Sequence, residues 1–375
     1  MGLWRVSHSG VVARLAMGTL GSAALLLGGQ IPASASTAYG PAQLRAAYNV
    51  PSDITGAGQT IVIIAAFQSP AVGTDLAAFD PACGHPDAAA CLSIVPLGGA
   101  TTPSMSQVPW FIEESTDVEW AHAIAPGAHL ILVEAKTGDD ADILSATKFA
   151  IDNNLGDVIS MSFSEAESCP TAEFLADEHA AFERAIDQGI TLVAASGNNG
   201  ALQHSCTGPF VQDVGTPASD PLVTAVGGSA LTIDASTNTY GSEAAWSGSG
   251  GGFSSLYSRP SYQAPFNKDK ARGVPDVAWH ASPAHPTLII ANGKARPTAG
   301  TSVATAEWAG VVALADEAAG HRLGLLNELL YHAAKSNGEA DRFHDISSGN
   351  RAWDAVTGLG TPDVANLVSW IAAHS

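Results

Sequence analysis

Basic side chains are scarce in this chain of 375 residues. Charged residues make up only 14 %, and 16 Lys and Arg stand against 36 Asp and Glu, which gives a formal net charge of −20. Phosphate backbones and anionic lipid repel a chain this acidic, which excludes nucleic-acid binding through a basic surface. Hydrophobic residues reach 46 %, so the chain is able to bury a large core and is not disordered as a whole.

Short metal-binding and phosphate-binding motifs are also missing. The four cysteines, Cys83, Cys91, Cys169 and Cys206, form no CxxC pair, and their spacing does not resemble a zinc site. The glycine-rich segment 248–252 fits neither GxGxxG at a strand–helix junction nor GxxxxGK[ST], so we do not expect a phosphate cradle.

The first 35 residues are typical of an export sequence. Arg5 and Arg14 precede or flank an apolar stretch at 15–29, and residues 33–35 (Ala-Ser-Ala) form a small-x-small cleavage site before Ser36. The apolar run is shorter than the ~20 residues that a membrane span needs. We therefore expect a signal peptide at 1–35 and a secreted, extracellular protein with no membrane segment in its mature form.

Export permits disulfides. Of the three possible pairings we favour Cys83–Cys91 as a local staple and Cys169–Cys206 as a clamp between two loops. The alternative is free, buried thiols.

Short β-branched runs alternate with longer helical patterns in the rest of the chain. The runs are apolar almost throughout, which predicts parallel strands covered by helices on both faces. We expect strands at 59–65, 129–134, 157–162, 190–195 and 222–226, and helices at 140–153 and 172–188. The predicted fold class is α/β with a mainly parallel sheet, and the active site of such a sheet lies beyond the carboxyl ends of its strands.

Three segments carry residues suited to chemistry. The segment 298–310 is a tight turn that leads into a helix of small residues, with Ser302 at its start. The free N–H groups and partial positive charge of a helix N-terminus favour a developing oxyanion. An isolated Ser in this place is more often a simple N-cap.

The second segment, 113–122, places Glu113 and Asp117 at i and i+4 of a helix, so the two carboxylates lie on one face. Such a pair shares a proton and is able to accept one from a hydroxyl. A solvated acidic face is the common alternative, but the flanking residues Trp110 and Trp120 indicate burial. Glu114 is a possible misassignment because it also lies three residues before Asp117.

The third segment ends an apolar strand with Asn198, whose amide is able to donate a hydrogen bond to an oxyanion. An Asn-rich turn is the alternative for this residue taken alone.

Together these segments resemble the sedolisin family, the serine-carboxyl peptidases, which share the subtilisin-like fold. The resemblance covers nearly the whole chain after the export sequence, in matching order at 39–48, 56–62, 113–117, 125–130, 158–163, 273–277, 300–302 and 344–360. It implies that Ser302 is the nucleophile, Glu113 the general base and Asp117 the residue that orients the base. Asn198 stands where sedolisins usually have an Asp, and it would hold the oxyanion.

The resemblance also implies one calcium ion in the tail. Asp345 and Asp354 match the carboxylate ligands, and Ile346 matches a main-chain carbonyl donor. The intervening loop is shortened, so the carbonyls of Asn350 and Ala352 would complete the set together with water. Sedolisins usually carry a long N-terminal prodomain. We expect none here, with residues 36–375 forming the peptidase domain alone.

The expected activity is hydrolysis of polypeptide substrates by a secreted, monomeric serine-carboxyl endopeptidase that favours acidic pH. A Ser/His/Asp peptidase of the subtilisin type is one alternative, but it needs a His-Gly-Thr motif that the sequence does not contain. His122 lies near the right helix without that motif. A secreted, non-catalytic binding protein on a peptidase scaffold is the alternative from a different class.

Overall fold

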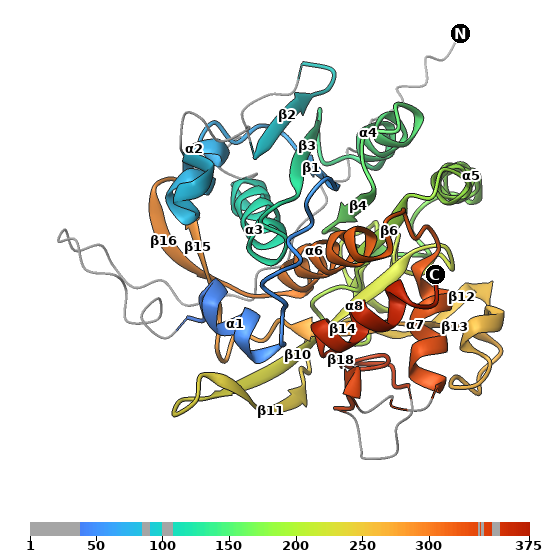
Figure 1. Cartoon of the computed structure of the whole chain (residues 1–375). Helices are drawn as coiled ribbons and strands as arrows, with labels where there is room; N and C mark the ends of the chain where they lie inside the picture. Colours follow the sequence, from blue (N-terminus) through green and yellow to red (C-terminus); the bar gives the residue numbers. More distant parts are fainter. Residues whose placement is uncertain (1–37, 85–90, 100–107, 337, 339–340, 347–352) are drawn as a thin grey trace, which may run out of the picture.

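The computed structural model describes residues 38–84, 91–99, 108–336, 338, 341–346 and 353–375 (Figure 1). The expected signal peptide lies outside the described residues. The helices are α1 (Pro41–Ala47), α2 (Val72–Phe79), α3 (Pro109–Ile124), α4 (Asp140–Asp152), α5 (Ala172–Asp187), α6 (Thr301–Ala319), α7 (Leu326–Lys335) and α8 (Val364–Ala372), with 3-10 turns η1 (Pro81–Gly84) and η3 (Ser261–Gln263).

The strands of the main sheet are β1 (Thr60–Ala66), β2 (Leu92–Pro96), β3 (His129–Ala135), β4 (Val158–Met161), β6 (Thr191–Ala195), β10 (Thr224–Asp234), β11 (Thr239–Ala245) and β14 (Val277–His280). Short two-stranded sheets are formed by β5 (Glu165–Ala166) with β9 (Gly215–Thr216), β7 (Leu202–His204) with β8 (Phe210–Gln212), β12 (Gly252–Ser258) with β13 (Ala271–Val274), β15 (Thr287–Ala291) with β16 (Lys294–Thr298), and β17 (Phe343–His344) with β18 (Thr361–Pro362).

The main sheet has the order β11-β10-β6-β4-β1-β3-β2, and β14 pairs with β10. Every pairing in it is parallel except that of β10 with β11. The predicted mainly parallel sheet is therefore confirmed, and the five predicted strands correspond to β1, β3, β4, β6 and β10.

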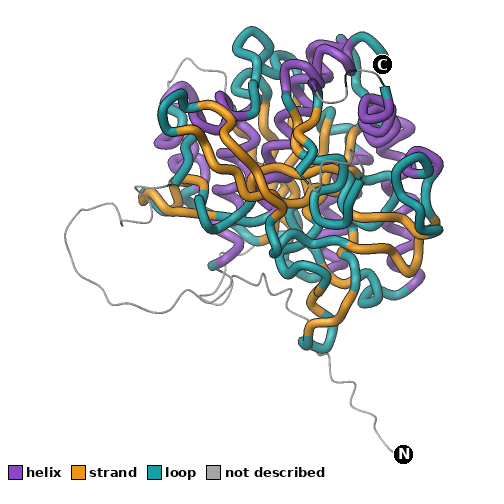
Figure 2. The backbone as a smooth tube through the Cα atoms, turned by 90° about the horizontal axis from the view of Figure 1, so that it is seen from below, coloured by secondary structure: helices purple, strands orange, loops and turns teal. Residues whose placement is uncertain are grey.

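Helices cover both faces of this sheet. In Figure 1, α3 and α6 lie on one side of β1 and β4, and α4 and α5 lie on the other. Figure 2, turned by 90°, shows the strands in the middle and the helices around them. Strands β4 and β6 are buried along their whole length, as expected for strands between two layers of helices.

Helix α6 runs through the core and packs closely against α3. Its residues are buried from Thr301 to Asp316. The approach of the two helices depends on Gly310, because a Cβ there would lie only 2.6 Å from the Cβ of Ile124 in α3. The two helices therefore hold a fixed spacing.

The N-terminus of α6 lies at the carboxyl ends of β4 and β6. The hydroxyl of Ser302 donates to the carbonyl of Ser162, the residue after β4. The amide of Thr301 donates to the side chain of Asn198, in the loop after β6. Three distant segments of the sequence thus meet at this edge of the sheet.

Many carboxyl groups of this fold are removed from water. Burial is the largest cause of a raised pKa in each of them, and it outweighs the local hydrogen bonds. The pKa rises to about 9 for Glu114 and Glu119, to about 8 for Glu165, Glu178 and Asp316, and to about 7 for Glu134.

These shifts predict that the protein is more stable in acid than at neutral pH. A raised pKa means that the folded state holds a proton that the unfolded chain has already lost, so stability falls as pH rises from about 4.5 toward 9. One pKa unit corresponds to about 1.4 kcal/mol. We expect the melting temperature to be higher at pH 5 than at pH 8.

The buried residue Glu134 and the exposed residue Glu173 provide a matched test. Glu134→Gln should make the fall in melting temperature between these two pH values shallower, and Glu173→Gln should leave it unchanged. A melting temperature that rises with pH would contradict the prediction.

Candidate active site

Helix α3 carries the predicted carboxyl pair in a fully buried segment. Glu113 is 7 % exposed and Asp117 is 1 % exposed. The polar residues of α3 face the interior as much as its aromatic ones do, which excludes a solvated acidic face. The fold confirms that the two carboxyls lie on a helix, one turn apart.

Burial raises the pKa of both groups. The pKa of Glu113 rises to about 7 because its charged form is desolvated, and contact with the Ser302 hydroxyl lowers it by less. The pKa of Asp117 rises well above its ordinary value, first through burial and then through the neighbouring Glu113. The pair therefore retains at least one proton at neutral pH.

Ser302 lies in the first turn of α6. It is 6 % exposed, and its hydroxyl lies beside Glu113, since the pKa of that carboxyl responds to it. The structure thus brings together Ser302, Glu113 and Asp117 from α6 and α3.

Ser162 is a neighbour of this group that the sequence analysis did not single out. Its hydroxyl donates to the carbonyl of Ser302 at 3.4 Å, and its contact with Asp117 lowers the pKa of that carboxyl. It therefore links the carboxyl pair to the backbone of α6. Its place at the carboxyl end of the strand predicted at 157–162 was the available clue.

Asn198 caps the N-terminus of α6 from the side. Its Oδ1 accepts hydrogen bonds from the amide of Thr301 at 2.8 Å and from the hydroxyl of the same residue at 3.0 Å. These bonds engage the oxygen end of the side chain and identify the other end as the amide nitrogen. Asn198 as a whole is partly exposed.

Glu114 belongs to a different cluster from Glu113. Its Oε2 accepts the amide of Ser69 at 2.9 Å. The carboxyl of Glu134, at the end of β3, is the neighbouring charge that helps to raise the pKa of Glu114. Glu114 faces Ser69 and Glu134, whereas Glu113 lies beside the hydroxyl of Ser302. The geometry therefore favours Glu113 as the partner of Ser302.

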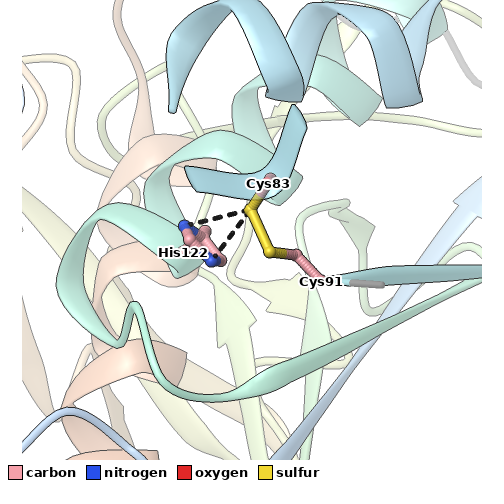
Figure 3. Close-up of side chains that lie close together, drawn as sticks. All are labelled: Cys83, Cys91 and His122. Atoms are coloured by element: carbon pink, nitrogen blue, oxygen red, sulfur yellow. Dashed lines mark hydrogen bonds between the residues drawn. A yellow bond between two sulfur atoms is a disulfide. The ribbon is translucent and has the colours of Figure 1, made fainter. Parts of the chain in front are cut away.

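His122 is engaged elsewhere. Its Nδ1 lies 3.2 Å from a carboxylate oxygen of Asp80, and its Nε2 lies 3.2 Å from Sγ of Cys83 (Figure 3). Both ring nitrogens thus face groups other than Ser302.

The disulfide predictions have different outcomes. Cys83 and Cys91 form a disulfide, as predicted. The prediction of a Cys169–Cys206 disulfide is wrong for this structure, in which both residues are free cysteines. The two residues do lie together, since the amide of Cys206 donates to Sγ of Cys169, so the predicted proximity is present and the predicted bond is not.

The tail residues predicted to bind calcium are only partly described. Asn350 and Ala352 lie outside the described residues. Oδ1 of Asp354 accepts the amides of Val356 and Thr357, and its Oδ2 accepts the hydroxyl of Thr357 at 2.6 Å. This carboxylate therefore stabilises its own turn.

Calcium requires more oxygens than the described tail residues provide. Asp345, Asp354 and the Ile346 carbonyl have the chemistry of calcium ligands, but calcium takes six to eight oxygens. Among the described residues, side chains of metal-ligating type gather in a group of three only at Cys83, Cys91 and His122. The donor types of the tail fit calcium, and their number is incomplete.

The chain matches the subtilase family model over residues 110–360. It is 30 % identical to kumamolisin of Bacillus sp. (strain MN-32), over 88 % of this chain and 63 % of that protein. It is 25 % identical to sedolisin of Pseudomonas sp. (strain 101), over 92 % of this chain and 63 % of that protein. The chain thus spans less than two thirds of the length of these relatives.

A solved structure of Pseudomonas sedolisin extends the similarity to the fold. That serine-carboxyl proteinase, complexed with two molecules of pseudo-iodotyrostatin, superimposes with a TM-score of 0.78 at 25 % identity, over 90 % of this chain and 98 % of that chain. The predicted subtilisin-like fold is confirmed. The chain belongs to the subtilase family, and its sequence and fold are similar to those of the sedolisins.

Proposed function

We propose that this protein is a serine-carboxyl endopeptidase that cleaves polypeptides through an acyl-enzyme on Ser302. The observation that carries the proposal is the burial of Glu113 and Asp117 on one face of α3, with the Ser302 hydroxyl beside Glu113. A serine hydroxyl needs an adjacent base to become a nucleophile, and within the described residues Glu113 is the titratable group placed to serve it.

In the acylation step Oγ of Ser302 attacks the carbonyl carbon of the scissile bond, and its proton passes to Glu113. Asp117 keeps its proton, because its pKa is raised well above the ordinary value, and as the neighbour of Glu113 it would orient that carboxyl. The protonated Glu113 then gives its proton to the leaving amine. Water repeats the sequence on the acyl-enzyme and releases the second product.

The tetrahedral intermediate carries an oxyanion that needs donors. The N–H of Ser302 lies in the first turn of α6, where the amides are free and the helix dipole is positive. The amide nitrogen of Asn198 is the second donor, since its oxygen already faces Thr301. The main chain near Ser160–Ser164, at the carboxyl end of β4, would pair with the backbone of an extended substrate.

Two other functions are weighed against this one. A Ser/His/Asp mechanism would use His122, but its two nitrogens face Asp80 and Cys83. A non-catalytic binding protein would have no use for a hydroxyl beside a buried base. Covalent labelling of Ser302 by a peptide aldehyde or a fluorophosphonate distinguishes a peptidase from a binding protein.

We also propose that the protein is exported and works as a monomer in an acidic to neutral medium. The export sequence at 1–35 supports secretion. Among the described residues, no helix is long and apolar enough to cross a membrane. The resemblance to the sedolisins supports activity at acidic pH, and the raised pKa of Glu113, about 7, supports an extension to neutral pH, where the pair holds its single working proton.

Loss of any member of the catalytic group should abolish most of the activity. We expect Ser302→Ala, Glu113→Gln and Asp117→Asn each to lower kcat/KM on casein or a chromogenic peptide by roughly 10³-fold or more, with little change in the melting temperature. A double variant should be no slower than the worse single variant, because the residues act as one unit. Glu114→Gln is the matched control, and we expect it to keep kcat/KM within about tenfold. Loss of activity with Glu114→Gln but not with Glu113→Gln would overturn the assignment of the base.

Asn198 should set the alkaline limit of activity. An amide donates at every pH, whereas a carboxyl donates only while it is protonated. Asn198→Asp keeps an oxygen for the Thr301 cap and should shift the alkaline limb of the kcat/KM profile to lower pH, leaving the acid limb in place. Superimposable alkaline limbs would show that Asn198 is not the oxyanion donor.

Calcium should stabilise the tail, as the family resemblance implies. We propose that Asp345, Asp354 and the Ile346 carbonyl hold the ion, completed by carbonyls of Asn350 and Ala352 and by water. A ligand at a hundredfold excess over Kd stabilises the folded state by about 2.7 kcal/mol. A chelator should therefore lower the melting temperature of the calcium-loaded wild type and have no effect on Asp354→Asn. An equal melting temperature of the wild type with and without chelator would remove the calcium site.

A further inference from the structure

A buried histidine beside a disulfide lies outside the proposed catalytic group. The Cys83–Cys91 disulfide joins η1 to the start of β2. His122 comes from the last turns of α3 and is only 1 % exposed. Figure 3 shows its ring facing Sγ of Cys83.

The carboxylate of Asp80 places the proton of this ring as a carboxylate hydrogen-bonded to a metal-ligating histidine does. Nδ1 lies 3.2 Å from Oδ2 of Asp80. A carboxylate only accepts hydrogen bonds, so Asp80 fixes the proton on Nδ1 and leaves the lone pair on Nε2. Sγ of Cys83 lies 3.2 Å from Nε2 and 4.0 Å from Nδ1, to the side of that lone pair. A sulfur in a disulfide carries no proton, so within the described residues this buried nitrogen faces no hydrogen-bond donor.

Opening of the disulfide would turn the same atoms into a soft ligand set. The sulfurs of Cys83 and Cys91 and a ring nitrogen of His122 all lie within 4.8 Å of one another. Two thiolates and an imidazole are ligands that zinc prefers, at about 2.3 Å for sulfur and about 2.0–2.1 Å for nitrogen. In a tetrahedral site of that size the two sulfurs stand roughly 3.8 Å apart, so the two cysteines have to separate only slightly.

We propose that Cys83, Cys91 and His122 form a redox-gated site for a soft divalent cation such as Zn²⁺. An external dithiol reduces the Cys83–Cys91 bond, is itself oxidised to a disulfide, and leaves two thiols. The cation then displaces both thiol protons and binds the two thiolates and Nε2 of His122, while Asp80 orients the ring. Water fills the fourth position. The intact disulfide excludes the metal.

The position of His122 gives the site a structural consequence. His122 lies five residues after Asp117 on α3, about 7.5 Å along the helix axis. The disulfide ties η1 to β2 and does not include α3, whereas the bound cation ties all three elements. The cation would therefore replace the lost cross-link in the reduced protein and anchor the helix of the proposed carboxyl pair. The inference does not depend on the proposed peptidase activity.

The test uses the whole mature chain with Cys169→Ser and Cys206→Ser, because those free thiols would otherwise bind metal too. This protein is reduced with a dithiol, freed of it by gel filtration under argon, and titrated with Co²⁺ and then Zn²⁺. We expect one equivalent of Co²⁺ to give thiolate-to-metal charge-transfer absorption, which Zn²⁺ abolishes. The oxidised protein should give none. Zn²⁺ should raise the melting temperature of the reduced protein and leave that of the oxidised protein unchanged.

Variants separate the site from loose thiol binding. In the same background, Cys83→Ser with Cys91→Ser should abolish the absorption, and His122→Asn should weaken Co²⁺ binding by at least tenfold. Asp80→Asn keeps all three ligands and should weaken binding by about 10–100-fold, which provides a second variant if circular dichroism shows that His122→Asn is unfolded. Absence of Co²⁺ absorption in the reduced protein would overturn the proposal. So would a Co²⁺ affinity in the His122→Asn and Asp80→Asn variants equal to that of the background protein.

Discussion

Helix α3 holds Glu113 and Asp117 against α6. The free energy needed to remove two carboxylates from water determines the protonation of this pair. Burial of a charge is costly, and a carboxyl group avoids that cost by keeping its proton. The raised pKa values of the pair are the visible result. Gly310 allows α6 to lie close to α3, because a Cβ there would lie 2.6 Å from the Cβ of Ile124. Burial between the two helices thus keeps a proton on the pair and places Glu113 beside Ser302.

Other carboxylates extend this arrangement to the hairpin that precedes Ser302. Glu119 of α3 accepts the amide of Ile290 at 2.9 Å, and Asp75 of α2 accepts the amides of Asn292 and Gly293 at 2.8 Å each. The β15–β16 hairpin ends at Thr298, directly before the turn into α6. Helix α3 therefore fixes the proposed nucleophile from two directions, by packing on α6 and by holding the chain that leads into it.

The sequence predicted the parts of the structure that follow from local pattern. Continuous apolar runs gave the parallel strands, and the i, i+4 spacing placed Glu113 and Asp117 on one face of a helix. The choice between Glu113 and Glu114 could not be made from spacing, because it depends on the amide of Ser69 and on Glu134, which come from other elements. The thiols of Cys169 and Cys206 illustrate the same limit, since spacing shows which loops meet and does not decide whether a bond forms. The role of Ser162 is a tertiary contact, and residue type alone gave no sign of it.

The side chain at position 198 has two proposed tasks, to accept hydrogen bonds at the N-terminus of α6 and to donate one to an oxyanion. An ionised carboxylate is able to do only the first. The side chain approaches the helix closely because Gly300 has no Cβ, and a Cβ there would lie 3.2 Å from both amide atoms of Asn198. An ionised Asp would cap the helix well, since negative charge is favourable at its N-terminus. The loss of that proton would also remove the donor that an oxyanion needs. An amide avoids the conflict, because its oxygen accepts from Thr301 while its nitrogen donates at every pH. In the proposed site, the capping of α6 and the stabilisation of an oxyanion would therefore be independent of each other. The carboxyl pair on α3 would then be the element of that site whose function depends on pH.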